Sequence, residues 1–76
     1  MISFEVKNRH TDETQFVAEI NCATDTPNKD KLRLAVLWAL DNGVSLEDAN
    51  LEGANLKYTN LMFACLEGAN LEDAIL

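Results

Sequence analysis

The stretch LEDAN-LEGAN-LKYTN-LMFAC-LEGAN-LEDAI-L, residues 46–76, repeats itself every five residues without a slip. A leucine opens each block, and the position two before each leucine always holds a small or β-branched residue. Neither the 3.6-residue period of an α-helix nor the two-residue period of a β-strand brings all of these positions to one side. A coil with four flat sides does, so the repeat predicts a coiled β structure over residues 44–76.

The blocks resemble the pentapeptide-repeat family, whose pattern is alanine, then asparagine or aspartate, then leucine and any two residues. The pattern is present as Ala49-Asn50-Leu51, Ala54-Asn55-Leu56 and Ala69-Asn70-Leu71, with departures at Thr59, Cys65 and Ile75. The resemblance implies a right-handed quadrilateral β-helix in which each block forms one face and blocks four apart stack. It also implies that the leucine and the small residue point inward, while the two residues after each leucine point outward.

This geometry predicts a burial pattern for the whole repeat. We expect the leucine that opens each block to be buried and the glutamate that follows it to be exposed. The buried residues are then Leu46, Leu51, Leu56, Leu61, Leu66 and Leu71, and the exposed ones are Glu47, Glu52, Glu67 and Glu72. At about one and a half coils, the repeat needs a cover on its first coil, because an open ladder edge is not stable by itself.

Residues 1–43 are predicted to supply that cover. Apolar and polar residues alternate in residues 2–7, and a second β-prone run spans residues 15–20, which together predict a β-hairpin. A polar stretch follows, in which Thr26 suits a helix N-cap and Pro27 the first helical position.

The helix itself is predicted over residues 29–42. Eight of the nine residues 32–40 are apolar, so the helix should be wrapped on most sides and should plug the first coil. The expected fold class is therefore mainly β: a short right-handed quadrilateral β-helix, residues 44–76, capped by an N-terminal β-hairpin and one buried α-helix, residues 1–43. The two parts are expected to form one compact domain.

The charge is unevenly distributed. The chain has 13 acidic and 6 basic side chains, a net charge of −7. Residues 44–76 contain six of the acids and a single base, Lys57, and so carry −5 of that charge. Nucleic acid and anionic membranes both attract positive charge, so direct binding of either by this half is unfavourable. A basic protein partner is favoured.

Six carboxylates should gather on two adjacent faces of the coil, around one corner. Glu47-Asp48 is expected to stack on Glu67-Gly68, and Glu52-Gly53 on Glu72-Asp73. Two carboxylates ~5 Å apart in water repel by roughly 0.8 kcal/mol before screening, so the arrangement lowers stability. One hypothesis is a surface that imitates the phosphates of nucleic acid, and the alternative is a solvated face that keeps the protein soluble. The hypothesis assigns partner binding to Glu47, Asp48, Glu52, Glu67, Glu72 and Asp73.

Three large side chains, Tyr58, Met62 and Phe63, also fall at outward positions. They are candidates for an apolar contact with a partner, but for Met62 and Phe63 packing by the N-terminal segment is the favoured interpretation. Cys22 and Cys65 lie far apart and lack metal-ligand spacing, so both are interpreted as small buried apolar residues.

No sequence motif points to catalysis. His10 lies in a polar stretch with no partner at catalytic spacing and is interpreted as a surface residue. Nucleophile, phosphate-loop and metal motifs are not visible, so we expect neither an enzyme nor a bound cofactor or metal. The start of the chain lacks the form of a signal peptide and no apolar run is long enough to span a bilayer, which favours a cytoplasmic protein.

Residues 4–9 and 15–20 also resemble the leader of phage and prophage pentapeptide-repeat proteins. The resemblance implies an acidic, DNA-mimicking anti-CRISPR protein that blocks target-DNA recognition by a type I surveillance complex, type I-C being the expected subtype, in a bacterial host cell. Two alternatives stay open. One is the DNA-gyrase-binding branch of the family, whose members have many more coils. The other is a structural module that dimerises by stacking its open C-terminal coil on a second copy.

Overall fold

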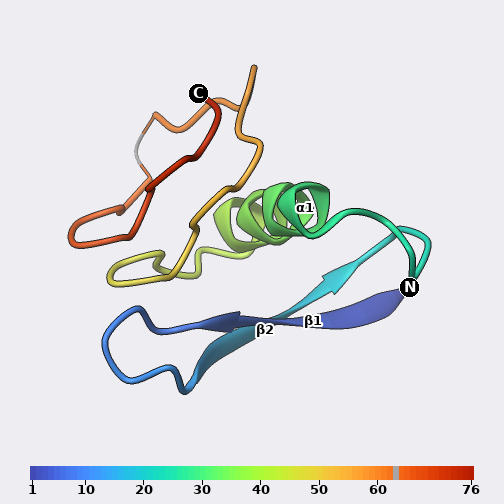
Figure 1. Cartoon of the computed structure of the whole chain (residues 1–76), viewed down its shortest axis with the longest axis horizontal. Coiled ribbons are helices and arrows are strands. Elements are labelled where there is room, and N and C mark those ends of the chain that lie inside the picture. Colours follow the sequence, from blue (N-terminus) through green and yellow to red (C-terminus); the bar gives the residue numbers. More distant parts are fainter. Residues whose placement is uncertain (63) are drawn as a thin grey trace.

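The computed structural model describes residues 1–62 and 64–76. Its elements are, in chain order, the strands β1 (Ile2–Lys7) and β2 (Thr14–Ile20) and the helix α1 (Asn28–Asp41), followed by the repeat segment. Figure 1 shows α1 lying over one face of the hairpin, with the repeat segment beside α1 and over the loop end of the hairpin. No helix in the described part of the chain is long and apolar enough to cross a membrane.

The N-terminal hairpin is confirmed, with β2 beginning one residue earlier than predicted. The strands are antiparallel and pair Ile2 with Ile20 and Val6 with Phe16, and the register shifts between Val6 and Lys7. Val6 and Ile20 are buried while their neighbours along each strand are exposed, as the alternation of apolar and polar residues requires. The apolar face of the hairpin packs on α1.

The helix is confirmed, but its predicted start is wrong by one position. Pro27, with ψ of 144°, is the N-cap in place of Thr26, and no side chain caps the helix. Because this ψ lies outside the helical region, the first helical residue is Asn28. At the other end the backbone N–H of Asn42 donates to the carbonyl of Trp38, and Gly43 then takes a left-handed φ of 67°.

Most sides of α1 are covered, as expected. Its buried residues are Leu32, Ala35, Val36 and Ala39. Trp38 stacks on Phe16 of β2 with ring centroids 6.1 Å apart, whereas Leu37 on the outer side is 40% exposed. One cluster of buried residues runs from Val6 in the hairpin through α1 to Leu56 in the repeats, so the two parts of the chain share a core.

Each block of the repeat contains a β-turn, and four blocks make one turn of the coil. The N–H of Ala49 donates to the carbonyl of Leu46, and the same bond recurs block by block through Ala74 and Leu71, at 2.9–3.1 Å. In the blocks where the structure describes it, the residue two after the leucine has positive φ, as at Gly53 (74°) and Gly68 (74°), which is the signature of a type II turn. This explains why glycine occurs at this position, and why the aspartate and tyrosine that replace it elsewhere are backbone-strained.

The asparagine before each leucine fixes the start of the next turn. Its side-chain oxygen accepts a hydrogen bond from the backbone N–H two residues on, as in the pairs Asn50–Glu52 (3.1 Å) and Asn70–Glu72 (3.0 Å). The side chains of Asn50 and Asn70 also bond each other at 3.3 Å. The asparagine of the repeat is therefore a structural residue, which satisfies backbone donors at each corner.

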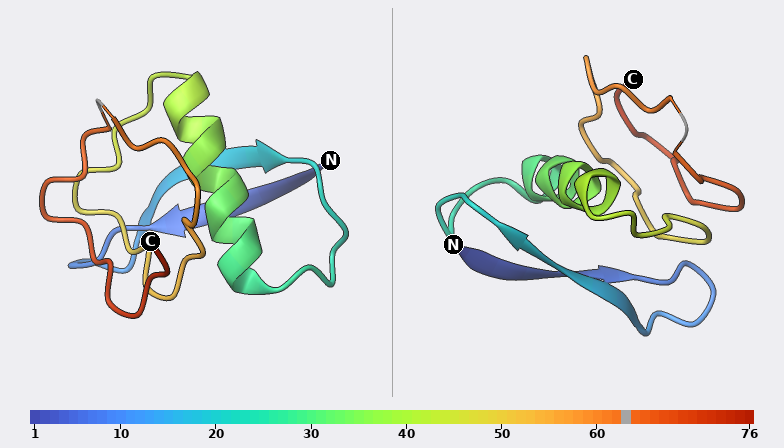
Figure 2. Two further views of the ribbon diagram at one scale, coloured as in Figure 1. Left: turned by 90° about the horizontal axis from the view of Figure 1, so that it is seen from above. Right: turned by 180° about the vertical axis from the view of Figure 1, so that it is seen from behind.

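Successive turns of the coil stack with the predicted register. Parallel bridges join Asn50 to Asn70 and Asn55 to Ile75, and the N–H of Leu51 donates to the carbonyl of Asn70 at 2.9 Å. Seen from above, both turns follow the same roughly square path (Figure 2). The repeats imply a β-helix in this segment. Residues 64–76 pair with the first turn of the coil through isolated bridges, not through continuous strands.

The predicted burial of all six leucines is only partly correct. Leu46, Leu51 and Leu56 in the first turn are at most 2% exposed. Leu61, Leu66 and Leu71 are half-buried, and the last leucine, Leu76, is 74% exposed. The first three leucines lie between the N-terminal part and the second turn, whereas Leu66 and Leu71 in the second turn have packed chain on one side only. Leu61 opens the fourth block of the first turn, and no block of the described chain stacks on it.

The edge of the first turn is covered by the hairpin as well as by the helix. Residues 1–43 were predicted to supply this cover, and both their hairpin and their helix contribute to it. The N–H of Asn50 donates to the carbonyl of Lys7 and the N–H of Arg9 to that of Asp48, both at 2.8 Å. The helix contributes the carbonyl of Lys29, which accepts from Asn55 at 3.1 Å. The end of β1 thus continues the ladder of the coil.

The cysteines also differ from expectation. Cys22 is half-buried and Cys65 is exposed, and both are free thiols. Cys65 occupies the place of the repeat's asparagine, at a corner of the coil, so its side chain lies near the surface, where its sulfur is 3.8 Å from a carboxylate oxygen of Glu47.

Candidate acidic interface

The turns of the coil place the predicted acidic residues on the surface. Glu47, Glu52, Glu67 and Glu72, each the first residue after a leucine, are all exposed as expected. Exposure varies more at the position two after each leucine. Asp73 is exposed, whereas Asp48 is half-buried, with 40% of its side chain accessible.

The two acidic faces stack as predicted. The N–H of Asp48 donates to the carbonyl of Glu67 at 3.0 Å, and the N–H of Gly53 donates to that of Glu72 at 2.9 Å. The backbone therefore holds Glu47-Asp48 against Glu67-Gly68 on one face and Glu52-Gly53 against Glu72-Asp73 on the next.

Three of the six carboxylates form a close cluster. Oxygens of Glu52, Glu72 and Asp73 all lie within 4.8 Å of one another, and the three side chains are exposed. At this separation two carboxylates repel by about 0.9 kcal/mol in water before screening. Three carboxylates supply at most part of the six to eight oxygen ligands that a calcium ion takes, so the cluster is a patch of negative charge.

The other acidic face has neighbours from the hairpin that sequence analysis missed. The guanidinium of Arg9 donates to the carbonyl of Gly68 at 3.0 Å, and the His10 imidazole lies 3.5 Å from a carboxylate oxygen of Asp48. Gln15 donates from its amide to the carbonyl of Glu47 at 2.8 Å. These contacts come from the loop end of the hairpin, and no spacing in the sequence signals them, because they depend on how the hairpin docks on the coil.

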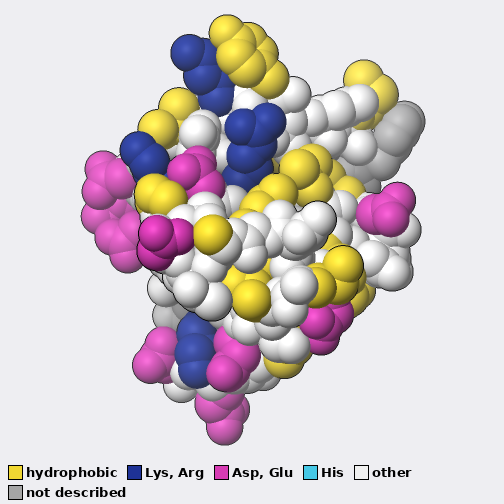
Figure 3. Space-filling model, turned by 90° about the vertical axis from the view of Figure 1, so that its right-hand side faces the viewer, with side chains coloured by type: hydrophobic (Ala, Val, Ile, Leu, Met, Phe, Trp, Pro, Cys, Tyr) yellow, Lys and Arg dark blue, Asp and Glu magenta, His cyan; other side chains and the backbone are white. Residues whose placement is uncertain are grey.

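The charge at the corner is therefore uneven. The face of Glu52, Glu72 and Asp73 is strongly negative, while on the adjacent face the Arg9 guanidinium lies at Gly68 and the His10 imidazole at Asp48. Elsewhere the surface is mixed: on the face in Figure 3, lysine, arginine and hydrophobic side chains are interspersed with groups of acidic ones.

The predicted apolar contacts are only partly described by the structure. Tyr58 is 90% exposed, with the Lys57 ammonium 5.3 Å from the centre of its ring, and Met62 is 69% exposed. Packing of Met62 under the N-terminal segment was therefore a wrong expectation, because the hairpin docks on the opposite edge of the coil. Phe63 lies outside the described residues.

One titratable group outside the repeats is perturbed. The Thr14 hydroxyl donates to the Glu5 carboxylate, and together with the Lys7 ammonium 3.5 Å away it lowers the pKa of Glu5 below its ordinary value of 4.5. All three groups are exposed on the hairpin.

Comparison with known proteins bears on the repeats. Neither the curated proteins nor the solved structures include a match to the chain. A family model, that of pentapeptide repeats, matches residues 42–76 in 8 copies, beginning two residues before the predicted boundary at residue 44. The match agrees with the five-residue turns, the stacked asparagines and the inward leucines described above. Residues 42–76 are therefore a pentapeptide-repeat segment.

Proposed function

We propose that this protein is an acidic binding module that occupies the nucleic-acid-binding surface of a basic protein in place of DNA. The observation that carries the proposal is that backbone hydrogen bonds stack the acidic blocks of the repeat on one another. Carboxylates of Glu52, Glu72 and Asp73 lie within 4.8 Å of one another on a hydrogen-bonded framework. DNA presents one phosphate charge per roughly 3.4 Å along each strand, a comparable spacing.

The rigidity of the framework supports this reading over a merely solvated face. Each acidic turn is closed by a backbone hydrogen bond, and two of them are also held by an asparagine side chain. A pre-formed array of charges loses little conformational entropy on binding. The centre of the proposed contact is the cluster of Glu52, Glu72 and Asp73, and Glu47, Asp48 and Glu67 flank it.

The resemblance of the leader to phage and prophage proteins suggests the first target to test. It favours an anti-CRISPR function in which the acidic surface blocks target-DNA recognition by a type I surveillance complex, with type I-C ahead of the other subtypes. DNA gyrase is the second target to test. The short coil disfavours it, because gyrase-binding relatives imitate a longer stretch of duplex.

The decisive experiment is a gel-shift assay of target DNA with a type I-C surveillance complex. Wild-type protein should release the complex from DNA, and this effect should weaken steeply as salt rises. Charge reversal by Glu52→Lys with Glu72→Lys should abolish it, and Glu47→Lys with Glu67→Lys should weaken it. Asp25→Lys with Asp41→Lys is the matched control, because it changes the net charge equally at exposed positions outside the coil.

Thermal melts accompany the assay to establish that every variant is folded. Inhibition that survives both reversals in the coil, or is lost equally in the control, would refute the mimicry proposal. A parallel gyrase supercoiling assay separates the two targets, since only the correct one responds to the reversals and not to the control.

Self-association is a second candidate, and the exposure of the second turn favours it. Leu76 is 74% exposed and Ile75 43%, beside the half-buried Leu66 and Leu71. Stacking of this end on a second copy would bury these side chains and continue the ladder. Solution mass measured by light scattering over a range of concentrations tests it, and a constant monomer mass would exclude it.

A further inference from the structure

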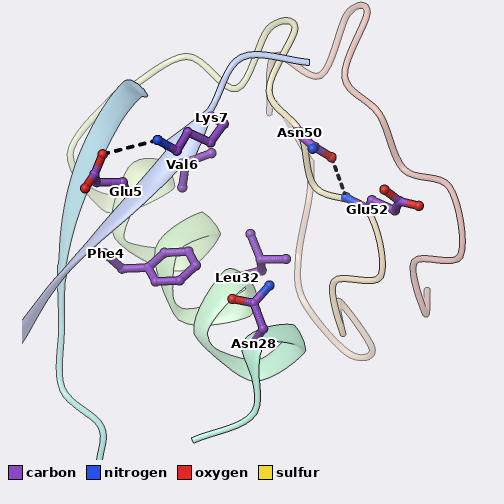
Figure 4. A pocket seen from close by; sticks show the side chains of 8 residues that line it. All are labelled: Phe4, Glu5, Val6, Lys7, Asn28, Leu32, Asn50 and Glu52. Carbon is purple, nitrogen blue, oxygen red and sulfur yellow. Dashed lines mark hydrogen bonds and ion pairs between the residues drawn. The ribbon is translucent and has the colours of Figure 1, made fainter. Parts of the chain in front are cut away.

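A groove of about 330 Å³ opens between the hairpin, the start of α1 and the first turn of the coil. Figure 4 shows it between β1 on one side and the segment of Asn50 and Glu52 on the other, with Asn28 and Leu32 of α1 beneath. The two sides meet where the N–H of Asn50 donates to the carbonyl of Lys7.

One wall of the groove is an unpaired strand edge. The sheet has two strands in the described chain, and β1 has β2 on one side and the groove on the other (Figure 4). The carbonyl of Lys7 faces the coil, and backbone groups in a strand alternate sides, so those of Glu5 and Ser3 face the groove as well. Such an edge is a template for a further strand.

The floor of the groove holds three apolar side chains, and polar and charged residues line the rest of it. The ring of Phe4 is half-buried, and Leu32 and Val6 are at most 6% exposed. On the coil side Glu52 lines the groove, and its carboxylate belongs to the cluster with Glu72 and Asp73.

The nearest basic side chain does not neutralise this side. The ammonium of Lys7 is engaged by the Glu5 carboxylate at 3.5 Å and by the Thr14 hydroxyl at 3.5 Å. Lys7 and Glu5 both line the groove, and their opposite charges offset each other.

We propose that this groove binds an extended basic segment of the partner protein as a third strand along β1. The backbone of the segment pairs with the edge at Ser3 and Glu5. A lysine or arginine lays its aliphatic stem over Phe4 and Leu32 and directs its charge to the cluster of Glu52, Glu72 and Asp73. The inference rests on the proposed function and deepens it, because it names the form of the basic element that the acidic module recognises.

The chemistry selects this occupant over others. A phosphate or an acidic peptide would meet Glu52 at the coil side of the groove, with the carboxylates of Glu72 and Asp73 close to it. A purely apolar peptide would leave those carboxylates without a counter-charge, and a folded basic domain without an extended segment could not reach the strand edge. A basic extended segment satisfies both the backbone edge and the charge.

The test is an amide NMR titration of the full chain with a short peptide of alternating lysine and valine. Shifts should map to residues 3–7, 28–32 and 50–53. A peptide with proline in place of each valine keeps the charge but lacks half of the backbone donors, and it should bind about tenfold or more weakly. Equal binding of the two peptides, or shifts that map elsewhere, would overturn the proposal.

A groove-filling variant gives an independent measurement. Asn28→Trp places a large ring in the groove from an exposed position and should weaken binding of the valine peptide about tenfold, whereas Asn21→Trp, at an exposed position outside it, should not. The proline-peptide comparison needs no variant and decides the matter if Asn28→Trp is unfolded. If Glu47→Lys with Glu67→Lys releases DNA recognition but Asn28→Trp inhibits like wild type, the proposed function stands and the groove proposal is wrong. If the peptide binds in the groove but no charge reversal in the coil affects inhibition, the groove proposal stands and the proposed function is wrong.

Discussion

The two turns of the coil should differ in how much each leucine contributes to stability. Leu51 and Leu71 occupy equivalent positions in stacked blocks, but Leu51 is 0% exposed and Leu71 is half-buried. Replacing a fully buried leucine with alanine lowers the free energy of unfolding by about 3 kcal/mol, because it removes apolar contact and leaves a cavity. For a domain of this size that is a fall in melting temperature of roughly 12–24 °C.

Leu71→Ala should have a much smaller effect. Part of this side chain is already in water, and the open side of the second turn leaves no enclosed cavity, so the expected loss is about 1–1.5 kcal/mol. Leu37→Ala on α1, at a position 40% exposed, is the control and should lose a similar amount. The measurement is urea denaturation of the three variants, with unchanged slopes establishing that the unfolding transition is the same.

Equal losses for Leu51→Ala and Leu71→Ala would refute the reasoning. That result would mean that the second turn is as closely packed in solution as the first, for example because a second copy covers it. Repeating the experiment at several protein concentrations separates these explanations, since stabilisation by association depends on concentration.

Three further predictions follow from the turns and the hairpin. Gly53→Ala should lower the free energy of unfolding by about 1 kcal/mol for its left-handed backbone, and Gly68→Ala by more, because its new methyl group meets the Asp48 carboxylate; thermal melts compare them. Glu72→Gln should raise the free energy of unfolding by about 0.5–1 kcal/mol at low salt, with the gain disappearing in about 1 M salt. Thr14→Val should raise the pKa of Glu5 toward 4.5 in an NMR titration. Because the folded-state pKa is the lower one, the stabilisation from Glu5 is present above pH 4.5 and is lost as pH falls through the folded-state pKa.

Much of the fold could be predicted because it depends on local periodicity. The five-residue register decides which residues line the coil, and the parallel bridge of Asn50 to Asn70 follows directly from it. The hairpin and α1 were predictable from alternation and from an apolar run bounded by turn residues. The exact start of α1 was not, since it depends on the ψ of Pro27.

The docking of the hairpin on the coil could not be predicted, and it changes the candidate site most. Arg9 and His10 lie far from Asp48 and Gly68 in sequence, and they meet only because the end of β1 pairs with the first turn. The partial exposure of Leu66 and Leu71 has a similar origin. A periodic pattern reports which way a side chain points, but burial also requires neighbours above and below it.

Because blocks four apart stack, the number of blocks between two acidic residues decides whether they lie on the same face of the coil. Inserting one further five-residue block between Leu61 and Leu66 would advance everything after it by one face. Glu72-Asp73 would then leave Glu52-Gly53 and lie against Lys57-Tyr58, and Glu67-Gly68 would move to Glu52-Gly53, although no acidic residue had changed. Inserting four blocks would restore the faces while separating the two acidic turns along the axis by one coil, about 4.8 Å. Length changes in whole blocks thus rearrange the surface of such a coil without altering its core.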